Sequence, residues 1–200
     1  TWHKARTEDV QAAIVAARDA QRDWASWRWE DRAGVFLKAA ELLATTHRAT
    51  LNAATMLGQS KTAYQAEIDA ACELIDFWRF NVQFASELYS EQPISSVGVW
   101  NQTDYRGLEG FVYAVTPFNF TAIGGNLPTA PALMGGTVIW KPAASAILSA
   151  CHTMQILEAA GLPPGVLHFV PGAAVTVTHE VLAQHQLAGV HVTGRTTDLN

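Results

Sequence analysis

The sequence has few basic residues and no long hydrophobic run, and each shortage excludes a class of protein. Its 13 Lys and Arg residues are outnumbered by 18 Asp and Glu residues, and the formal net charge is −5. No basic cluster offsets this charge, so we expect neither a nucleic acid nor an anionic membrane surface as a partner. No uncharged apolar stretch reaches the roughly 18 residues typical of a membrane-spanning helix, so we expect no membrane span.

Cysteine is also scarce, with only Cys72 and Cys151 in 200 residues. Both lie in segments of helical pattern, far apart, so we expect two buried free thiols rather than a disulfide. Free thiols are typical of a reducing compartment. We expect the cytoplasm, with the mitochondrial matrix as the alternative. The first residues, TWHKARTEDV, lack a signal-peptide or transit-peptide pattern and an initiator Met, which is what we expect of a segment from a longer chain.

The familiar motifs for phosphate and metal binding are missing. Neither a G-x-G-x-x-G fingerprint nor a P-loop is present. The seven histidines form no ligand pattern, since His179-Glu180 and His185 have the wrong spacing for a zinc-protease helix. We therefore expect no metal site.

The residues that are present favour a packed protein whose first half is helical. Apolar residues make up 49% of the chain and charged residues 16%, a composition that forms a core. We expect residues 1–92 to be a helical region, because apolar residues recur there at helical spacing. The expected helices are residues 7–24, 30–45, 48–57 (ended by Gly58) and 62–89.

Short strands replace the helical pattern after residue 92. Residues 97–100 and 110–115 are rich in β-forming side chains and flank a polar segment, so we expect residues 93–115 to form a β-hairpin arm. Residues 116–200 alternate strands with helices, which predicts an α/β fold with a parallel sheet. The expected strands are 137–140, 166–170 and 188–192, and the expected helices are 145–160, ended by Gly161, and 175–184.

Three segments would meet at one edge of this sheet. Lys141, Pro171-Gly172 and Thr193-Gly194 each follow an expected strand. Ligands of such sheets bind beyond the carboxyl ends of the strands, so we expect a ligand at this edge.

The stretch from Tyr113 to Pro142, YAVTPFNFTAIGGNLPTAPALMGGTVIWKP, carries the strongest functional signal. Its prolines and glycines predict short strands, turns and short helices rather than one amphipathic helix. The TPFNF motif at residues 116–120, the apolar APALMGG segment and the strand ending in Lys141-Pro142 resemble the aldehyde dehydrogenase superfamily. The blocks LNAATMLGQSKTAYQAEIDAACELIDFWRFN and YRGLEGFVYAVTPFNFTAIGGNLP are similar to the subfamily that oxidises glutamate γ-semialdehyde to glutamate.

The resemblance covers essentially all 200 residues and implies a fold and an activity. It implies a variant Rossmann-like fold that lacks the glycine fingerprint, NAD-dependent oxidation of a small aldehyde, and a homo-oligomer in which the arm of residues 97–115 crosses to a neighbouring subunit. Family members use a cysteine nucleophile and a glutamate base that follow the Thr193-Gly194 motif. Cys151 lies inside an expected helix and does not match that nucleophile. We therefore expect the 200 residues alone to be inactive.

The resemblance also assigns roles around the aldehyde. The Asn of the family motif donates its amide N–H to the oxygen on which charge grows during attack, and it corresponds to Asn119. Phe120 would wall the aldehyde channel, and Glu73 would lie near the substrate tunnel.

The resemblance also implies contacts with the dinucleotide cofactor at three places in the chain. Thr116 would contact the dinucleotide through its backbone or hydroxyl, and Lys141 would hydrogen-bond the adenosine ribose. The segment expected to meet the pyrophosphate comprises Gly194, Arg195, Thr196, Thr197 and Asp198. Many members carry a carboxylate three residues after the lysine, where this chain has Ala144, so NADP stays open beside NAD.

Plainer interpretations stay open from the residues alone. Asn119 could cap a turn, Lys141 could enter solvent, and Asp69 and Glu73 could share a solvated helix face. The hairpin could cover its own core. The chain could also belong to another aldehyde dehydrogenase subfamily or be a non-catalytic nucleotide-binding or assembly module.

Overall fold

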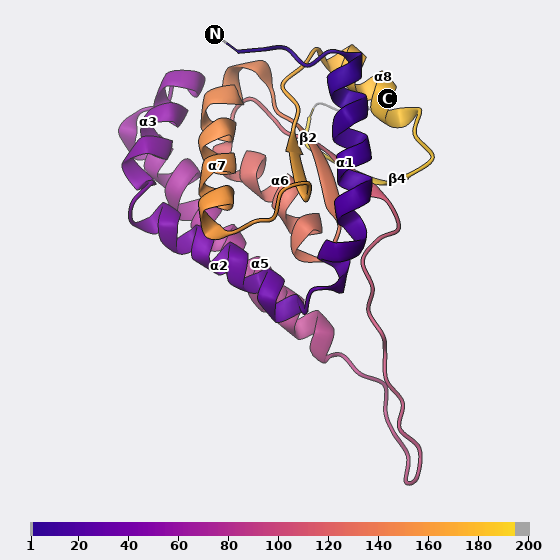
Figure 1. The fold of residues 1–200 in the computed structure, drawn as a ribbon. Helices are drawn as coiled ribbons and strands as arrows, with labels where there is room; N and C mark the ends of the chain where they lie inside the picture. Colours follow the sequence, from indigo (N-terminus) through magenta and orange to yellow (C-terminus); the bar gives the residue numbers. More distant parts are fainter. Residues whose placement is uncertain (1, 195–200) are drawn as a thin grey trace.

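A parallel β-sheet with helices on both faces forms the centre of the protein (Figure 1). The structure is a computed structural model and describes residues 2–194. The strands are β1 (Phe111–Val115), β2 (Thr137–Lys141), β3 (Leu167–Phe169) and β4 (Leu187–Val192). They lie in the order β3-β2-β1-β4, and all three pairings are parallel. The predicted α/β class and parallel sheet are confirmed.

The predicted helices are present, with one unpredicted change of helix type. They are α1 (Thr7–Ser26), α2 (Trp29–Ala44), α3 (Arg48–Gln59), α4 (Ala63–Ala66), the π-helix η1 (Glu67–Glu73), α5 (Leu74–Ser90), α6 (Thr121–Leu133), the 3₁₀ turn η2 (Ala144–Ala146), α7 (Ile147–Ala160) and α8 (Ala174–Leu182). The segment expected as one helix over residues 62–89 is thus α4, η1 and α5 in succession. None of the helices within residues 2–194 is long and apolar enough to cross a membrane.

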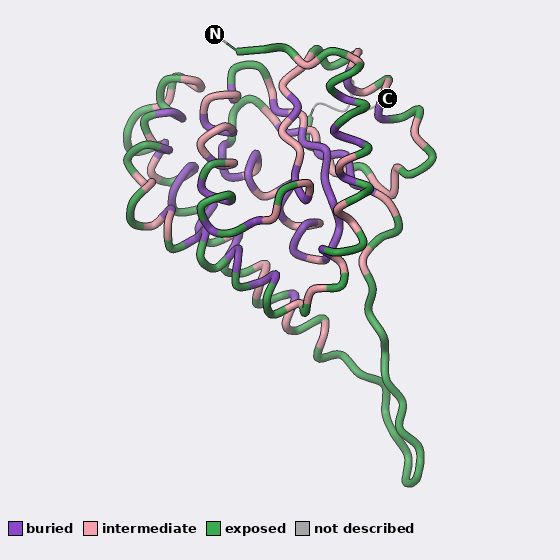
Figure 2. Tube along the Cα trace, in the orientation of Figure 1, coloured by how far each residue is buried: buried purple, intermediate pink, exposed green. Residues whose placement is uncertain are grey.

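Alternate side chains of the central strand enter two separate cores, as the two-residue period of a strand requires. Phe111 and Tyr113 pack with residues of α1 and α8, whereas Val112 and Ala114 pack with residues of α2, α5, α6 and α7. The edge strand β4 is only partly buried, but β1 and β2 are buried on both faces, which Figure 2 shows as purple at the centre of the molecule. Burial on both faces explains why their sequences are continuously apolar.

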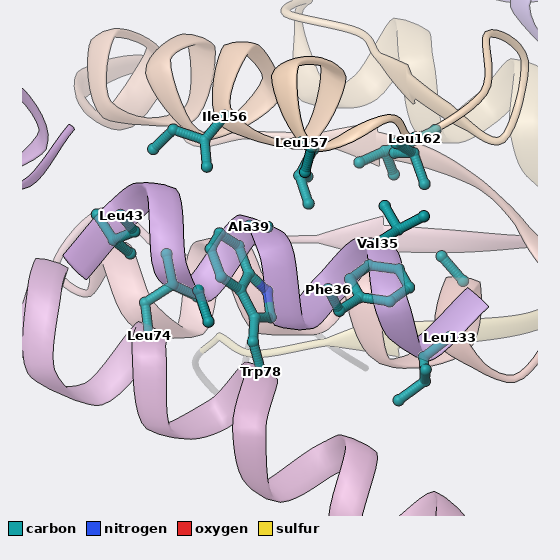
Figure 3. Packing of buried hydrophobic residues seen from close by; sticks show 14 of the residues in the cluster. Val35, Phe36, Ala39, Leu43, Leu74, Trp78, Leu133, Ile156, Leu157 and Leu162 are labelled. Atoms are coloured by element: carbon teal, nitrogen blue, oxygen red, sulfur yellow. The ribbon is translucent and has the colours of Figure 1, made fainter. Parts of the chain in front are cut away.

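Helix α2 lies at the centre of the larger core. Figure 3 shows Phe36 and Ala39 of α2 between Leu157 of α7 and Trp78 of α5. The Trp78 indole N–H donates to Thr129 Oγ1 at 3.0 Å, so its polar atom is satisfied inside the core.

Helix α6 is continuous although it contains Pro128 and Pro131. A proline has no N–H for the carbonyl four residues earlier, so Pro131 leaves the Leu127 carbonyl without its helical donor. His191 Nδ1 of β4 lies 2.9 Å from that carbonyl oxygen and donates to it. A partner from the sheet thus replaces the missing helical hydrogen bond. The strand, turn and helix predicted for the Tyr113–Pro142 stretch are all present.

The hairpin predicted for residues 93–115 is wrong in its second half. Phe111–Val115 is β1, which pairs with β2 and β4 instead of with the arm. Its apolar side chains are better buried between helices than beside a polar, exposed segment. The boundary between arm and sheet therefore falls near residue 110 rather than at residue 115.

The arm itself is extended and exposed. Figures 1 and 2 show residues 91–110 leaving the body and doubling back. This described segment contains no β-strand. Its two limbs are joined through side chains: Asn101 Nδ2 donates to the Ile94 carbonyl at 2.9 Å, and the Tyr105 hydroxyl donates to the Glu91 carbonyl at 3.0 Å.

Two glycines predicted as helix ends differ in their outcome. Gly161 has φ of 101° and ends α7, as expected. Gly58 lies inside α3, and the left-handed residue after that helix is Ser60, with φ of 53°. A Cβ on Gly58 would lie 2.6 Å from the Ser145 carbonyl oxygen, so this glycine permits close packing of α3 on η2.

Candidate functional site

The order of the strands creates a crevice beside β1. The chain passes from β1 to β2 through α6, which packs in the larger core, and it reaches β4 through α8, which packs on the opposite face with α1. The chain thus adds β2 and β3 on one side of β1 and then crosses to add β4 on the other side, so the strand order reverses at β1. Ligands of open α/β sheets bind at such a switch point. The order of the strands therefore supports the expectation that a ligand binds at this edge of the sheet.

A groove of about 940 Å³ lies at this crevice. Its lining comes from β1 and the following loop (Tyr113, Val115, Pro117, Phe118, Asn119, Phe120), from β4 and its end (Val190, Val192, Thr193, Gly194), from α6 (Ile123), from α8 (Ala174, Thr178, Leu182) and from Ala143. Pro171-Gly172, also expected at this edge, does not line the groove. Gly172 instead pairs with Ala5 in an isolated bridge.

Asn119 lies in this groove and is exposed. Its neighbours Phe118 and Phe120 are also exposed, at 58% and 40%. The N–H groups of Thr121 and Ala122 at the start of α6 are occupied by another residue, Asp69. An Asn that caps a turn accepts from the N–H two residues later, which for Asn119 is the Thr121 N–H. The turn-capping interpretation of Asn119 is therefore not supported, and the residue is exposed in the lining of the groove.

Asp69 was expected on a solvated helix face, and this expectation is wrong. The residue is 3% exposed, whereas Glu73 is exposed. Both belong to η1, but Asp69 is held against Lys61 and the start of α6, whereas Glu73 borders a groove. Sequence reasoning could have used one signal: Phe120 at the N-cap of α6 has no side-chain acceptor, so the first N–H groups need one from elsewhere.

Glu73 lines a second groove on the other side of Phe120. This groove of about 600 Å³ lies between η1, α5 and α6, and Phe120 and Ile123 line both grooves. Burial raises the pKa of the Glu73 carboxyl, and the negative charge of Asp69 raises it further. Phe120 thus separates the groove that holds Asn119 from the groove that holds Glu73.

Lys141 is placed beside the first groove rather than in its lining. It ends β2 opposite Val115, which does line the groove, and it is half-buried. Burial lowers the pKa of the Lys141 ammonium. Ala144, where many family members carry a carboxylate, is exposed at the start of η2.

Thr116 faces the core instead of the groove. It is 4% exposed, and its hydroxyl accepts from Trp140 Nε1 at 2.9 Å. Its backbone N–H donates to the Lys141 carbonyl at 3.2 Å. Thr116 therefore holds the ends of β1 and β2 together. Of the pyrophosphate segment, Gly194 lines the groove, while Arg195, Thr196, Thr197 and Asp198 lie outside the described residues.

The cysteines lie away from both grooves. Cys72 and Cys151 are free, but Cys72 is exposed and Cys151 is only half-buried, so the expected burial of both thiols is wrong. Burial, followed by the charge of Glu158, raises the pKa of the Cys151 thiol, which disfavours its thiolate. Among residues 2–194 no group of three or more metal-ligating side chains is gathered.

Known proteins share this sequence and architecture. The model of the aldehyde dehydrogenase family matches residues 1–197. A delta-1-pyrroline-5-carboxylate dehydrogenase named mitochondrial, from Emericella nidulans, is 56% identical over 98% of this chain and 34% of its own length. The protein of the same name from Homo sapiens is 52% identical over 92% of this chain and 33% of its own length.

The fold of this chain also matches that of a solved structure. The delta-pyrroline-5-carboxylate dehydrogenase from Mycobacterium tuberculosis bound with NAD has a TM-score of 0.96 and 60% identity, covering 98% of this chain and 36% of that protein. The chain thus spans about a third of the length of the proteins it matches. The family model and these relatives show that the chain belongs to the aldehyde dehydrogenase family.

Proposed function

We propose that the protein carrying this chain oxidises L-glutamate γ-semialdehyde, the open form of 1-pyrroline-5-carboxylate, to L-glutamate with NAD. The observation that carries the proposal is the exposure of Asn119 in the groove at the switch point of the sheet. The names and identities of the relatives support this choice of substrate.

The groove fits a dinucleotide in size and composition. It is about 940 Å³ in volume, lies at the carboxyl ends of parallel strands, and has the half-buried Lys141 beside its lining. A cation shielded from water is suited to hydrogen-bonding ribose oxygens, which we propose as the role of Lys141. The NAD-bound structural relative favours NAD, although Ala144 provides no carboxylate to reject NADP.

When bound, NAD accepts the hydride that leaves the aldehyde carbon. Gly194 would approach the pyrophosphate, as would Arg195, Thr196, Thr197 and Asp198. Thr116 would act through the strand ends it holds together, since its hydroxyl faces Trp140.

Asn119 would supply the electrostatic part of catalysis. Its amide N–H would donate to the carbonyl oxygen as that oxygen gains negative charge, an interaction stronger in the transition state than with the substrate. Phe120 would wall the aldehyde channel, and Glu73 would border the adjoining substrate groove. We propose that the cysteine nucleophile and the glutamate base lie in the part of the relatives that this chain does not span.

An aldehyde panel tests the proposed substrate. A full-length version should oxidise glutamate γ-semialdehyde with a kcat/KM at least about 100-fold above that for butanal, because a site built to pair with charged substrate groups rejects an analogue that lacks them. NADH formation followed at 340 nm measures both rates. A preference for butanal would favour another subfamily. NAD binding without oxidation of any aldehyde would favour a non-catalytic nucleotide-binding module.

We also propose that the arm contacts a second copy of the protein. Ile94, Val97 and Trp100 are 91%, 105% and 83% exposed on this extended segment. Large apolar side chains gathered at such exposure typically mark an interaction surface.

Sedimentation velocity of the full-length version tests the arm contact. The double variant Val97→Asp/Trp100→Asp should shift the distribution to a smaller species, because charges in an apolar interface are costly to bury. Leu57→Asp is a matched control, since Leu57 is 78% exposed on α3, away from the arm. Unchanged sedimentation of the arm variant would rule out this contact.

Relatives from Emericella nidulans and Homo sapiens are named mitochondrial. Their names support the mitochondrial matrix, the alternative compartment in the sequence analysis. The expected cytoplasm receives no such support.

A further inference from the structure

A buried carboxylate holds the start of α6, directly after the loop that carries Asn119. Asp69 Oδ2 accepts from the Thr121 backbone N–H and Asp69 Oδ1 from the Ala122 backbone N–H, both at 2.9 Å. Lys61 Nζ donates to Asp69 Oδ2 at 2.6 Å. The side chains of Lys61 and Asp69 are only 16% and 4% exposed. Three donors therefore satisfy a charge that would otherwise be costly to bury.

This arrangement links the helical region to the groove over a long sequence distance. Most helices are capped by a side chain next to them in sequence, but here the acceptor is 52 residues from Thr121. Asn119 is separated from the first capped N–H by Phe120 alone. The position of Asn119 is consequently tied to η1 through a short, rigid connection.

Lys61 also contacts the residue between Asn119 and the helix. Its Nζ lies 4.5 Å from the centroid of the Phe120 ring, within range of a cation–π interaction. Lys61 therefore contacts Asp69 on one side and Phe120 on the other.

We propose that Asp69, paired with Lys61, is a positioning residue that fixes the Asn119 carboxamide at the groove. The inference rests on the oxyanion role proposed for Asn119. Asp69 lines neither groove; it acts through the first turn of α6, while its partner Lys61 contacts Phe120. Displacement of a catalytic group by about 1 Å lowers rates by about 100-fold, so loss of this anchor should reduce turnover.

Asp69→Asn in a full-length version tests the proposal. Asparagine offers one acceptor oxygen in place of two, and its amide N–H₂ would face an N–H or the Lys61 ammonium. We expect kcat to fall by about 10- to 100-fold, while the Kd for NAD changes less than about twofold because the Lys141 end of the sheet is untouched. A kcat within about twofold of the parent would overturn the proposal.

Glu67→Gln is the matched control. Glu67 belongs to the same π-helix and accepts from Arg48 Nε at 2.8 Å, but its partners lie on α3 and on η1 itself rather than on α6. We expect its kcat to stay within about twofold of the parent, since a partly exposed ion pair contributes little. An equal loss in both variants would indicate general damage to η1 and overturn the proposal.

A double-mutant cycle separates positioning from simple destabilisation. If Asp69 acts through Asn119, then Asp69→Asn should have little further effect on kcat in an Asn119→Ala background. If the two effects multiply, Asp69 acts independently of Asn119 and the proposal fails. If Asn119→Ala alone leaves kcat unchanged, the proposed function of Asn119 fails first, so the two failures are distinguishable.

Lys61→Gln provides a second test of the positioning role if Asp69→Asn yields no soluble protein. It removes the cation but leaves both backbone donors to Asp69. We expect kcat to fall by about 3- to 10-fold, and this loss should also disappear in the Asn119→Ala background. A loss that persists in that background would overturn the proposal.

Discussion

Replacing Asn119 with alanine in a full-length version is expected to lower kcat by about 10²- to 10³-fold, the loss typical of removing one oxyanion donor. The residue is exposed in the groove, and Asp69 already accepts from the Thr121 N–H that a turn-capping Asn119 would use. Its removal should therefore cost little stability. Steady-state NADH formation with saturating aldehyde and NAD measures the change in kcat.

Asn119→Asp and Lys141→Ala complete this test. Aspartate keeps the shape of the side chain but has no N–H and adds negative charge beside the growing oxyanion, so its kcat should be no higher than that of the alanine variant. Lys141→Ala should mainly raise the Kd for NAD and change kcat less, whereas Asn119→Ala should mainly lower kcat. An unchanged kcat in Asn119→Ala would remove this residue from the reaction.

Trp140→Ala should cause a large loss of stability, lowering the free energy of unfolding by about 3–5 kcal/mol. Trp140 is 0% exposed on β2, and its ring meets that of Phe169 edge-on with centroids 5.3 Å apart. Its indole N–H donates to Thr116 Oγ1 at 2.9 Å. Alanine would leave a cavity and remove one of the two hydrogen bonds through which Thr116 joins the ends of β1 and β2. Urea unfolding of the chain followed by circular dichroism measures the loss.

Trp140→Phe and Trp2→Ala are the controls for this prediction. Phenylalanine keeps most of the apolar volume but loses the hydrogen bond, so a smaller loss is expected. Trp2 is 46% exposed, and its replacement should change the free energy of unfolding by less than about 0.5 kcal/mol. Equal losses for Trp140→Ala and Trp2→Ala would contradict the packing described for Trp140.

The parallel sheet could be predicted from the sequence because its signals are local. Strand and helix patterns alternate after residue 116, and short crossover helices favour parallel pairing. The hairpin was mispredicted for the same reason. Apolar residues at 110–115 identify a strand, but a local pattern does not specify its partner, and burial between helices on both faces favoured pairing with β2 and β4.

The location of a site residue was predictable where a sequence motif identifies that residue directly. The TPFNF motif located Asn119, and the structure places it in the groove. The orientation of Thr116 was not predictable, because its core-facing hydroxyl depends on Trp140, a residue 24 positions away. Asp69 was missed because the helix N–H groups that bury it lie 52 and 53 residues away in sequence, and helical spacing alone does not identify such partners.

The central claim is most directly tested by a crystal structure of the full-length version with NAD and L-glutamate. The distance to measure joins Asn119 Nδ2 to the nearest γ-carboxylate oxygen of glutamate, which takes the place of the aldehyde oxygen. We predict about 2.7–3.2 Å, the range of an N–H···O hydrogen bond. A separation beyond about 5 Å, or a carboxamide turned away from the groove, would contradict the role proposed for Asn119.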